Sequence, residues 1–559
     1  RIDANGNVVI PLDEAGARKI LADLRDEGVE AVAVCTLFAT VNPVHELRLR
    51  SLLTEELPNV FVSLSHDISP TIGEYARMST TAANAALGPI AGRYLSRLES
   101  ELRAAGMPVP VLMMTCNGGV LPTEVLTDRP AIALFSGPAA GVKGTEAMGR
   151  TMGLGNMLTT DIGGTSFDVG VIVAGAPVMR SEISISGADI RVHSVDVDSI
   201  GAGGGSIARA EGGELRVGPG SAGSTPGPAC YGRGGILPTA TDADLVLGVL
   251  DPDNFLGGRM RLDVEAARRA IHDHVAVPLG LGLMEAAWGI RKVLDSKMAD
   301  LLRRMTVERG HNPQEFTLFA NGGAGPSHAW VLAAELGLKG FVVPAAATAQ
   351  SAYGTGNADL GFSTERPTYV RVAPGDQPTT DQIESVNAST AQAVAETRRN
   401  LLLASPDRDV AIELVAAIRF RGQTNHLDVP LSGQTLDQDG FSDLTARFEA
   451  LYEQLFGRGS SYSSAGFELL SIRAAGSCSL PPPARGSLGD PITRAGSRKV
   501  VFDDPSAALD TAIYKTVFPN PGASVAGPCI VEFPGQSVVV PPGAKAVADV
   551  FGNLVVGTN

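Results

Sequence analysis

The sequence predicts an α/β protein with several domains. Strand-like and helix-like patterns alternate along most of the 559 residues. The composition is rich in alanine, valine, leucine and glycine, whereas aromatic residues make up only 5%. Such a composition is typical of alternating strands and helices rather than of an all-β protein. A chain of this length corresponds to roughly three to four domains and buries a sizeable core.

Charge and cysteine content restrict the classes of function. The net charge of −15 argues against broad binding of nucleic acid or of an anionic membrane. It leaves a nucleotide possible, because glycine amides and a metal ion can carry phosphates. The five cysteines form no C-x-x-C pair, so we expect neither a disulfide framework nor a zinc site, and we expect a cytoplasmic location. No apolar run reaches the roughly 20 residues of a membrane span.

The first 130 residues show the alternation of elements. Asn42 and Pro43 indicate a helix start, with asparagine as cap and proline at the first position. The loop at residues 116–119 follows a strand, which is the usual place for a ligand in an open α/β sheet. The expected strands are residues 7–10, 29–38, 60–64 and 111–114, and the expected helices are residues 13–27, 42–56 and 74–102.

A glycine hairpin at residues 159–170 is the central feature of the sequence. Two apolar strands flank a tight turn that glycines make at little cost. Consecutive amides in such a turn form an anion site, and the adjacent carboxylate of Asp161 can hold a hydrated Mg²⁺. The hydroxyls of Thr165 and Ser166 lie beside it. The pattern alone leaves two readings open: a phosphate-binding hairpin for ATP, or an ordinary Gly-Gly hairpin with a solvated aspartate.

Two more glycine clusters follow the hairpin. Residues 199–206 form the first, after an apolar alternation. In the second, a strand at residues 316–320 leads into the glycine-rich residues 321–326 and then into a helix. Amides and helix dipole converge at such a junction and suit a nucleotide, although no Walker lysine follows. His328 is either a ligand or, more commonly, a satisfied histidine at a helix start.

The middle of the chain contains one irregular stretch and one long helix. Residues 218–235 look structureless, and a stretch of that length inside a domain is usually functional. Asp242 and Asp244 fit helix capping better than metal ligation. Residues 284–309 are expected to be the longest helix. Its core side chains should be Ile290, Val293, Leu294, Leu301, Leu302 and Met305.

The last third of the chain is expected to change character. Prolines at residues 365–379 and 481–483 indicate boundaries. The expected helices are residues 380–404 and 444–456, and the expected paired strands are residues 410–420 and 426–429. From residue 498 onward short β-like runs alternate with turns.

The order of the three glycine sites resembles the second phosphate motif, the phosphate-flanking glycines and the adenosine motif of the actin/sugar-kinase/heat-shock ATPase superfamily. Longer strings are similar to the hydantoinase/oxoprolinase family, A-type subunit, which includes N-methylhydantoinase A, 5-oxoprolinase and the acetone carboxylase β subunit. The strings that carry the resemblance are residues 135–142, 201–206, 224–235, 241–244, 321–329, 420–423 and 527–532.

The resemblance implies a fold and a domain order. It implies an actin/sugar-kinase/heat-shock ATPase-like core of α/β class, with a C-terminal α+β region and a β-rich region. The expected segments are residues 1–78, the remainder of an N-terminal domain; residues 79–366, the ATPase core; residues 367–485, the α+β region; and residues 486–559, the β-rich region.

The resemblance also implies a function. It implies that the chain uses ATP and Mg²⁺ to phosphorylate an amide-type or ketone carbonyl. The substrate would be a hydantoin, 5-oxoproline, another lactam or a ketone. A B-type subunit would complete ring hydrolysis or carboxylation. Phosphorylation turns the carbonyl oxygen of a poor electrophile into a good leaving group. The protein then mainly has to position the reactants and neutralise their charge. The alternatives are a non-catalytic ATP-binding scaffold or degenerate member, and a sugar-kinase-type enzyme.

Roles for single residues follow from the same resemblance. Asp161 would be the catalytic residue and the metal ligand, holding Mg²⁺ through water or orienting the nucleophile. Asp168 either takes part or pins the hairpin. The nucleotide contacts would be Gly163, Gly164 and Thr165 for the β/γ-phosphates, Gly203, Gly204 and Ser206 closing over them, and Gly322, Gly323 and Gly325 for adenosine.

One expected motif is absent from the sequence. Members of the family begin with a first Asp-x-Gly-Gly-Thr phosphate hairpin, and no such string occurs before the hairpin at residue 161. The chain begins at Arg1 in the middle of an expected strand. We therefore expect that it lacks its natural beginning and that ATP binds weakly to this chain alone.

Overall fold

The computed structural model describes residues 1–107, 109–185, 187–403, 406–481 and 489–558. They divide into two compact units whose segments interleave along the chain. The four domains expected from the sequence stay a prediction. Unit 1 consists of Arg1–Ser136, Met179–Ser194 and Ala358–Pro481, and unit 2 consists of Gly137–Val178, Val195–Asn357 and Pro482–Asn559.

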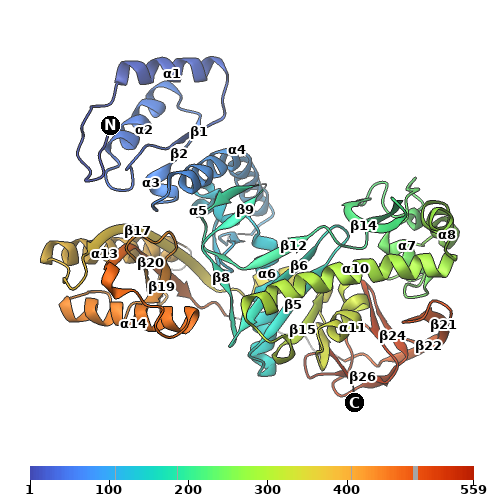
Figure 1. The fold of residues 1–559 in the computed structure, drawn as a ribbon. Coiled ribbons are helices and arrows are strands. Elements are labelled where there is room, and N and C mark those ends of the chain that lie inside the picture. The colour runs from blue at the N-terminus through green and yellow to red at the C-terminus, as the bar shows by residue number, and fades with distance from the viewer. Residues whose placement is uncertain (108, 186, 404–405, 482–488, 559) are drawn as a thin grey trace. The chain divides into compact units, whose positions relative to one another are not determined.

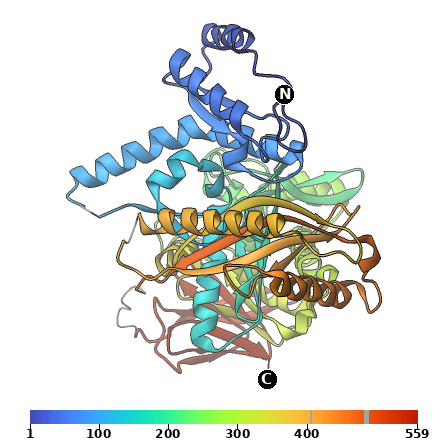
Figure 2. The same cartoon turned by 90° about the vertical axis from the view of Figure 1, so that its left-hand side faces the viewer.

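A six-stranded sheet forms the main core of unit 1. Its strand order is β19-β18-β20-β17-β4-β3. Helices α13 (Thr380–Leu402) and α14 (Gln438–Phe456) pack their apolar side chains on the long antiparallel strands (Figure 2). The strands are β3 (Leu112–Met114), β4 (Val120–Pro122), β17 (Leu360–Val372), β18 (Ala411–Phe420), β19 (Leu427–Pro430) and β20 (Phe467–Cys478).

The N-terminal part of unit 1 is a small α/β layer. Strands β1 (Ala31–Val34) and β2 (Phe61–Leu64) pair in parallel. The crossover helix between them is α2 (Val44–Glu56), and it shares an apolar cluster with α1 (Glu14–Asp26) (Figure 1). The 31-residue helix α4 (Glu74–Ala104) packs against both strands.

A nine-stranded sheet organises unit 2. Its main path is β12-β6-β5-β15-β16-β27-β26-β23, and β7 (Ala176–Pro177) pairs with β6. The parallel neighbours β5, β15 and β16 lie at its centre. The other bounds are β5 (Met157–Ile162), β6 (Phe167–Val173), β12 (Val197–Ile200), β15 (Thr317–Asn321), β16 (Gly340–Val343), β23 (Ser524–Ala526), β26 (Ala544–Ala548) and β27 (Leu554–Thr558).

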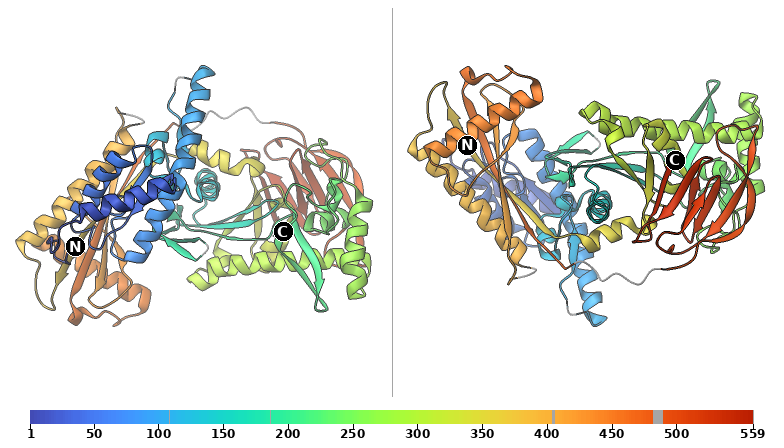
Figure 3. Two further views of the ribbon diagram at one scale, coloured as in Figure 1. Left: turned by 90° about the horizontal axis from the view of Figure 1, so that it is seen from above. Right: turned by 90° about the horizontal axis from the view of Figure 1, so that it is seen from below.

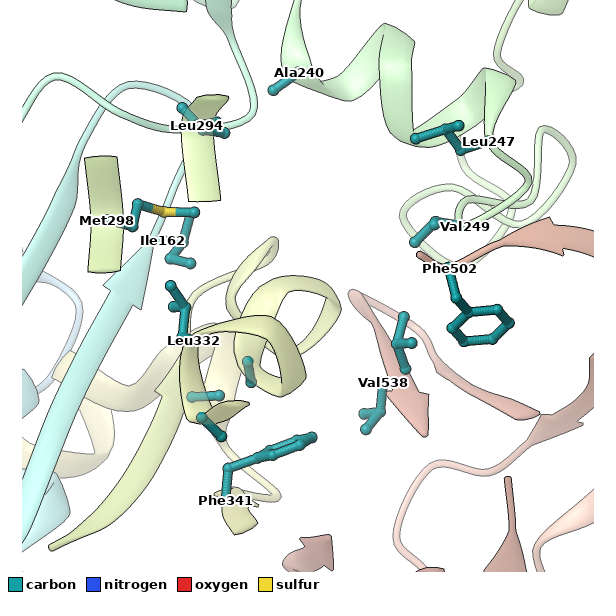
Figure 4. Close-up of a cluster of buried hydrophobic side chains, with 14 of the residues drawn as sticks. Ile162, Ala240, Leu247, Val249, Leu294, Met298, Leu332, Phe341, Phe502 and Val538 are labelled. Atoms are coloured by element: carbon teal, nitrogen blue, oxygen red, sulfur yellow. The ribbon is translucent and has the colours of Figure 1, made fainter. Parts of the chain in front are cut away.

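Helices cover both faces of this sheet. Helix α10 (Leu283–Thr306), the long yellow-green helix of Figure 3, packs with α11 (Gly325–Glu335) on one face. Ile162, Leu294, Met298 and Leu332 converge there (Figure 4). On the opposite face lies α6 (Ser136–Met152), where Thr145 Oγ1 donates to Thr159 Oγ1 at 2.8 Å.

The β-rich C-terminus is part of the same core. A four-stranded sheet, β21-β22-β24-β25, contributes buried side chains such as Val538, which lies near Phe502 in Figure 4. Strands β26 and β27 extend the nine-stranded sheet. The small sheet consists of β21 (Thr493–Val501), β22 (Ala508–Lys515), β24 (Cys529–Phe533) and β25 (Gln536–Val540).

Most expected elements are present, and a few expectations are wrong. Residues 7–10 form no strand; only an isolated bridge joins Ile2 and Val8. The longest described helix is α4, not α10. The boundary expected at residues 365–379 stays a prediction; Pro367 itself lies within β17, beside a bulge where its missing N–H is not needed. Strand β14 (Glu214–Ser221) extends into the stretch expected to be irregular.

Two further features complete the fold. The five cysteines are free thiols, as expected from their spacing. Among the described residues, no helix is both long enough and apolar enough to cross a membrane. The expected linker at residues 481–483 lies, apart from Pro481, outside the described residues.

Candidate functional site

The hairpin of β5 and β6 presents an open glycine turn. Asp161 and Asp168 are register partners at its end, and the N–H of Gly163 donates to the carbonyl of Ser166 at 3.2 Å. Gly164 and Thr165 are exposed. A Cβ atom built at Gly163 or Gly164 would meet no atom within 4 Å. The turn therefore leaves its backbone free for a ligand to approach.

Polar side chains form a row across four neighbouring strands. Ser199 on β12, Asp168 on β6, Asp161 on β5 and Asn321 on β15 are register partners in sequence across the sheet. Register partners point to the same face of a sheet. That face also carries Thr159, to whose hydroxyl the Nδ2 of Asn321 donates at 3.1 Å.

The electrostatics of this row suit a cation. Burial and the nearby carboxylate of Asp168 raise the pKa of Asp161 to about 6. Burial also raises the pKa of Asp168, against hydrogen bonds with Ser199 and Ser166 that lower it. The buried Oδ1 of Asn321 has no hydrogen-bond partner among the described residues. Carboxylate and amide oxygens are ligands that Mg²⁺ prefers, so these residues fit a hydrated Mg²⁺.

The second glycine cluster lies directly against the hairpin turn. The N–H groups of Gly204 and Gly205 donate to the carbonyls of Gly163 and Gly164, at 3.0 and 2.7 Å. A Cβ atom at Gly203 would lie 2.7 Å from the carbonyl oxygen of Gly163, so the backbones approach too closely for a side chain. Glycine is required there for packing.

Side chains behind the second cluster hold it in place. Ser206 is fully buried, and its Oγ accepts a hydrogen bond from the N–H of Gly203 at 2.9 Å. The hydroxyl of Thr241 donates to the carbonyl of Gly204 at 2.8 Å. Thr241 belongs to α7 (Ala240–Val246), which is capped by Thr239 and Asp242 in a capping box, as expected for Asp242. The position of this loop is therefore fixed by α7.

The third glycine segment closes against the same strand end. Gly322 has φ +82°, and a Cβ there would lie 2.5 Å from Asp161 Oδ1. The N–H of Ala324 donates to the carbonyl of Ile162 at 3.1 Å. Gly323 is exposed, and Gly325 begins α11. All three glycine segments thus converge around the end of β5, next to Asp161.

The sequence is similar along its length to one protein family and to known members of it. Three models match: hydantoinase/oxoprolinase at residues 77–363, the hydantoinase/oxoprolinase C-terminal domain at residues 379–554, and the hydantoinase/oxoprolinase N-terminal region at residues 1–57. The chain is 34% identical to the caprolactamase subunit alpha of Pseudomonas jessenii, covering 98% of this chain and 79% of that protein. It is 31% identical to the acetone carboxylase beta subunit of Xanthobacter autotrophicus, covering 98% and 78%.

Structural comparison agrees with the sequence. The crystal structure of the ATP-dependent caprolactamase from Pseudomonas jessenii superposes with a TM-score of 0.87 at 32% identity, covering 100% of this chain and 81% of that one. The chain belongs to the hydantoinase/oxoprolinase family. Its architecture is that of an actin-like ATPase with additional C-terminal strands. The family model at residues 77–363 spans all three glycine segments.

This hydantoinase/oxoprolinase chain also has a buried charge cluster that the sequence did not predict. Arg291 and Asp295 on α10 meet Asp244 on α7 and His328 on α11, and all four are nearly inaccessible to solvent. Arg291 Nη1 lies 2.6 Å from Asp244 Oδ1, and His328 Nδ1 lies 2.5 Å from Asp295 Oδ1. Asp244 is thus an ion-pair partner, not a helix cap. His328 proves to be a buried core histidine, whose Nδ1 pairs with Asp295 and whose Nε2 lies 3.4 Å from Asp244 Oδ2.

The cluster joins the supports of two glycine segments. Helix α7 holds Gly204 through Thr241, and α11 begins at Gly325. Arg291 donates to the carbonyl of Ser327 in the first turn of α11 as well as to Asp244. A signal exists in the sequence, because Arg291 and Asp295 lie four residues apart among the core positions of a helix.

The pH dependence of stability should reflect His328. Burial alone lowers the pKa of His328, but the carboxylates of Asp295 and Asp244 outweigh it and raise the pKa to about 9, above the ordinary histidine value of 6.5. The contribution of His328 to stability is complete below its pKa in the unfolded state. It is lost as the pH rises through its pKa in the folded state. We expect the melting temperature of unit 2 to fall between pH 6.5 and pH 9. In His328→Gln this pH-dependent fall should be smaller; an identical pH profile would contradict the assignment.

The contact between the first two glycine segments can be tested with a matched pair of variants. Gly203→Ala places a Cβ 2.7 Å from a carbonyl oxygen and should destabilise unit 2 by about 1–3 kcal/mol. Gly164→Ala adds a Cβ in open space and should change stability little. Thermal unfolding followed by circular dichroism separates the two. Equal melting temperatures for both variants would mean that the loops do not pack as described.

Proposed function

We propose that this chain binds ATP with Mg²⁺ at the three glycine segments of unit 2 and uses it to activate an amide-type or ketone carbonyl. The convergence of these segments on Asp161 carries the proposal. An open amide turn, a helix N-terminus and a half-buried carboxylate pair lie together there. The relatives named above, an ATP-dependent caprolactamase and an acetone carboxylase subunit, support the same chemistry.

Each glycine segment would contact a different part of the nucleotide. The amides of Gly163 and Gly164 and the hydroxyl of Thr165 would bind the β/γ-phosphates, since this turn is open. Gly203 and Gly204 would close over them, and Ser206 would act from behind by fixing Gly203. Gly322, Gly323 and Gly325 would contact adenosine. These contacts fix the nucleotide before reaction, so little reorganisation is needed in the transition state.

Asp161 would hold the metal ion. Asp168 and Asn321 lie in the same row and offer further oxygen atoms. Among the described residues no group of three or more His, Cys, Asp and Glu side chains could hold a metal ion. A Mg²⁺ would therefore keep water and phosphate oxygens as its remaining ligands, which suits this ion. When bound, it would neutralise phosphate charge during transfer.

The chemistry answers a problem of reactivity. An amide carbonyl is a poor electrophile at neutral pH. Transfer of the γ-phosphoryl group to the carbonyl oxygen yields ADP and makes that oxygen part of a good leaving group. For a lactam, one water adds to the activated carbon and the C–N bond breaks, which leaves an acyl phosphate. A second water attacks the carbonyl carbon of this acyl phosphate and releases phosphate that carries the oxygen of the substrate. The chain itself mainly positions ATP and the carbonyl substrate and neutralises the charge of the phosphates.

A second subunit is part of the proposal. The relatives are named as the alpha subunit of caprolactamase and the beta subunit of acetone carboxylase. We propose that a B-type subunit completes ring hydrolysis or carboxylation after activation. The substrate class is then a hydantoin, a lactam such as 5-oxoproline, or a ketone.

The test is ATP consumption measured against a panel of carbonyl compounds, with and without the second subunit. We expect phosphate release that depends on one class of carbonyl and increases when the second subunit is present. ATP binding without any carbonyl-dependent turnover would instead favour a non-catalytic ATP-binding scaffold.

A further inference from the structure

Unit 1 contains a cavity of about 790 Å³, and all of its lining residues belong to this unit. The cavity brings together two parts of the sequence: Cys116 and Asn117 from the loop at residues 116–119, and Thr424 to His426, which directly follow the string at residues 420–423. None of its lining residues belongs to the three glycine segments. Its volume lies in the range of sites for small organic ligands.

Part of the lining is apolar and buried. Phe362, Leu121 and Ala131 are each at most 3% exposed. Ile132 and Val192 extend this surface. The methylene groups of a ring would leave water on contact with these side chains, which is favourable by about 25 cal/mol per Å².

Each guanidinium group of the lining is paired with a carboxylate, either in the lining or next to it. The lining holds five carboxylates and four guanidinium groups. Every guanidinium group has a carboxylate partner, so none is left to neutralise an anionic ligand. The pairs are Arg129 with Asp67 at 2.9 Å, Arg191 with Glu182 at 3.3 Å, Arg473 with Asp428 at 2.6 Å, and Arg366 with Glu396.

An uncharged hydrogen-bonding group is available in the same lining. The Nδ1 of His193 is buried and has no hydrogen-bond partner among the described residues. Burial and the nearby Arg473 lower the pKa of His193 to about 4, against the opposing effect of Asp428, so the ring is neutral at pH 7. A neutral imidazole can donate to a carbonyl oxygen or accept from an amide N–H, depending on its tautomer.

We propose that this cavity binds the carbonyl substrate and selects an uncharged lactam, cyclic imide or ketone over one that carries a carboxylate. The inference rests on the proposed function for the identity of the ligand as a substrate. An apolar surface and a neutral hydrogen-bonding group suit an uncharged ring. A ligand carboxylate would enter beside arginines that are already paired, and would lose hydration without gaining a counter-ion.

The first test compares two lactams of similar size. Binding of ε-caprolactam and of 5-oxoproline to the full chain is measured by saturation-transfer NMR and calorimetry, without ATP. We expect ε-caprolactam to bind at least about 10-fold more tightly. Equal affinity, or tighter binding of 5-oxoproline, would overturn the selection by charge. Absence of ε-caprolactam binding would overturn the cavity as its site.

A pair of tryptophan substitutions locates the site. Ser181 is exposed and lines the cavity, whereas Ser184 is exposed, lies three residues further on and does not line it. Ser181→Trp should weaken ε-caprolactam binding by at least about 10-fold, since the ring would obstruct the space. Ser184→Trp should bind as the wild type does. Equal binding by both variants would place the ligand elsewhere.

A charge substitution tests the selection directly. Glu182→Gln removes the carboxylate partner of Arg191, whose guanidinium stays hydrogen-bonded to Thr71 Oγ1 at 2.9 Å. We expect binding of 5-oxoproline to strengthen by roughly 10-fold while that of ε-caprolactam is unchanged. No change for 5-oxoproline would contradict the proposal. These measurements need no ATP turnover, so failure of the proposed function would appear separately, as lactam binding without carbonyl-dependent phosphate release.

Discussion

Asp161→Asn is expected to reduce carbonyl-dependent ATP turnover by roughly 100- to 1,000-fold while leaving the protein folded. Asparagine has nearly the same shape but no charge to hold a hydrated Mg²⁺ or to orient the nucleophile. The variant should be no less stable than the wild type, because burial and Asp168 already disfavour the ionised form of Asp161. Phosphate release and the melting temperature are the two measurements.

The matched control for Asp161 is Asp198→Asn. Asp198 lies on β12, next to Ser199 in the chain, so its side chain points to the opposite face from the polar row. The chemical change is the same, but we expect near-normal turnover. Normal turnover in Asp161→Asn, or an equal loss in both variants, would refute the catalytic role of Asp161.

Arg291→Met is expected to destabilise unit 2 by about 3–5 kcal/mol. The substitution preserves most of the volume but leaves the buried carboxylates of Asp244 and Asp295 with only His328 for compensation. Trp288 and Trp330 are the only two tryptophans of the sequence, and both belong to unit 2. Intrinsic fluorescence during unfolding in urea therefore follows this unit selectively.

The control for Arg291 is its neighbour. Lys292→Met removes a cation that is about half exposed and lies 4.0 Å from Glu335, a pair that contributes less than about 1 kcal/mol. Nucleotide affinity should also fall in Arg291→Met, because the cluster connects the helices that support Gly204 and Gly325. If the two variants unfold at the same urea concentration, the cluster does not stabilise the unit.

The convergence of the three glycine segments, where we propose that the nucleotide binds, could largely be predicted from the sequence. The glycines of these segments occur where the backbone turns tightly or approaches another segment closely. Such glycine patterns can be recognised in the sequence without knowledge of the fold. Gly203 and Gly322 are glycines because neighbouring backbone or Asp161 occupies the space of a Cβ. The order of the three segments resembles that of the actin-like ATPase superfamily, and the longer strings resemble the family to which the chain belongs. The role of Ser206 was harder to judge, because only the structure shows that its hydroxyl is directed to Gly203.

Features that depend on distant contacts were harder to predict. Asp244, Arg291 and His328 come from three helices, and each alone looks like a cap, a surface charge or a stray histidine. Strand β20 is the central strand of its sheet, yet its sequence includes glycine, serine and arginine and lacks a strong apolar alternation. Pairing on both sides with β17 and β18 stabilises it as a strand. The continuation of β17 through Pro367 was likewise hard to predict, because the bulge beside it depends on pairing with β20.

The central claim is that the carbonyl oxygen of the substrate is phosphorylated by ATP bound at the Asp161 site. The most direct measurement uses a lactam labelled with ¹⁸O at the carbonyl, ATP, and the chain together with its second subunit. The phosphate released is examined by ³¹P NMR for the isotope shift. We predict one ¹⁸O atom per phosphate formed during ring opening, and no labelled phosphate with Asp161→Asn. Unlabelled phosphate alongside ring opening by the wild type would contradict the claim.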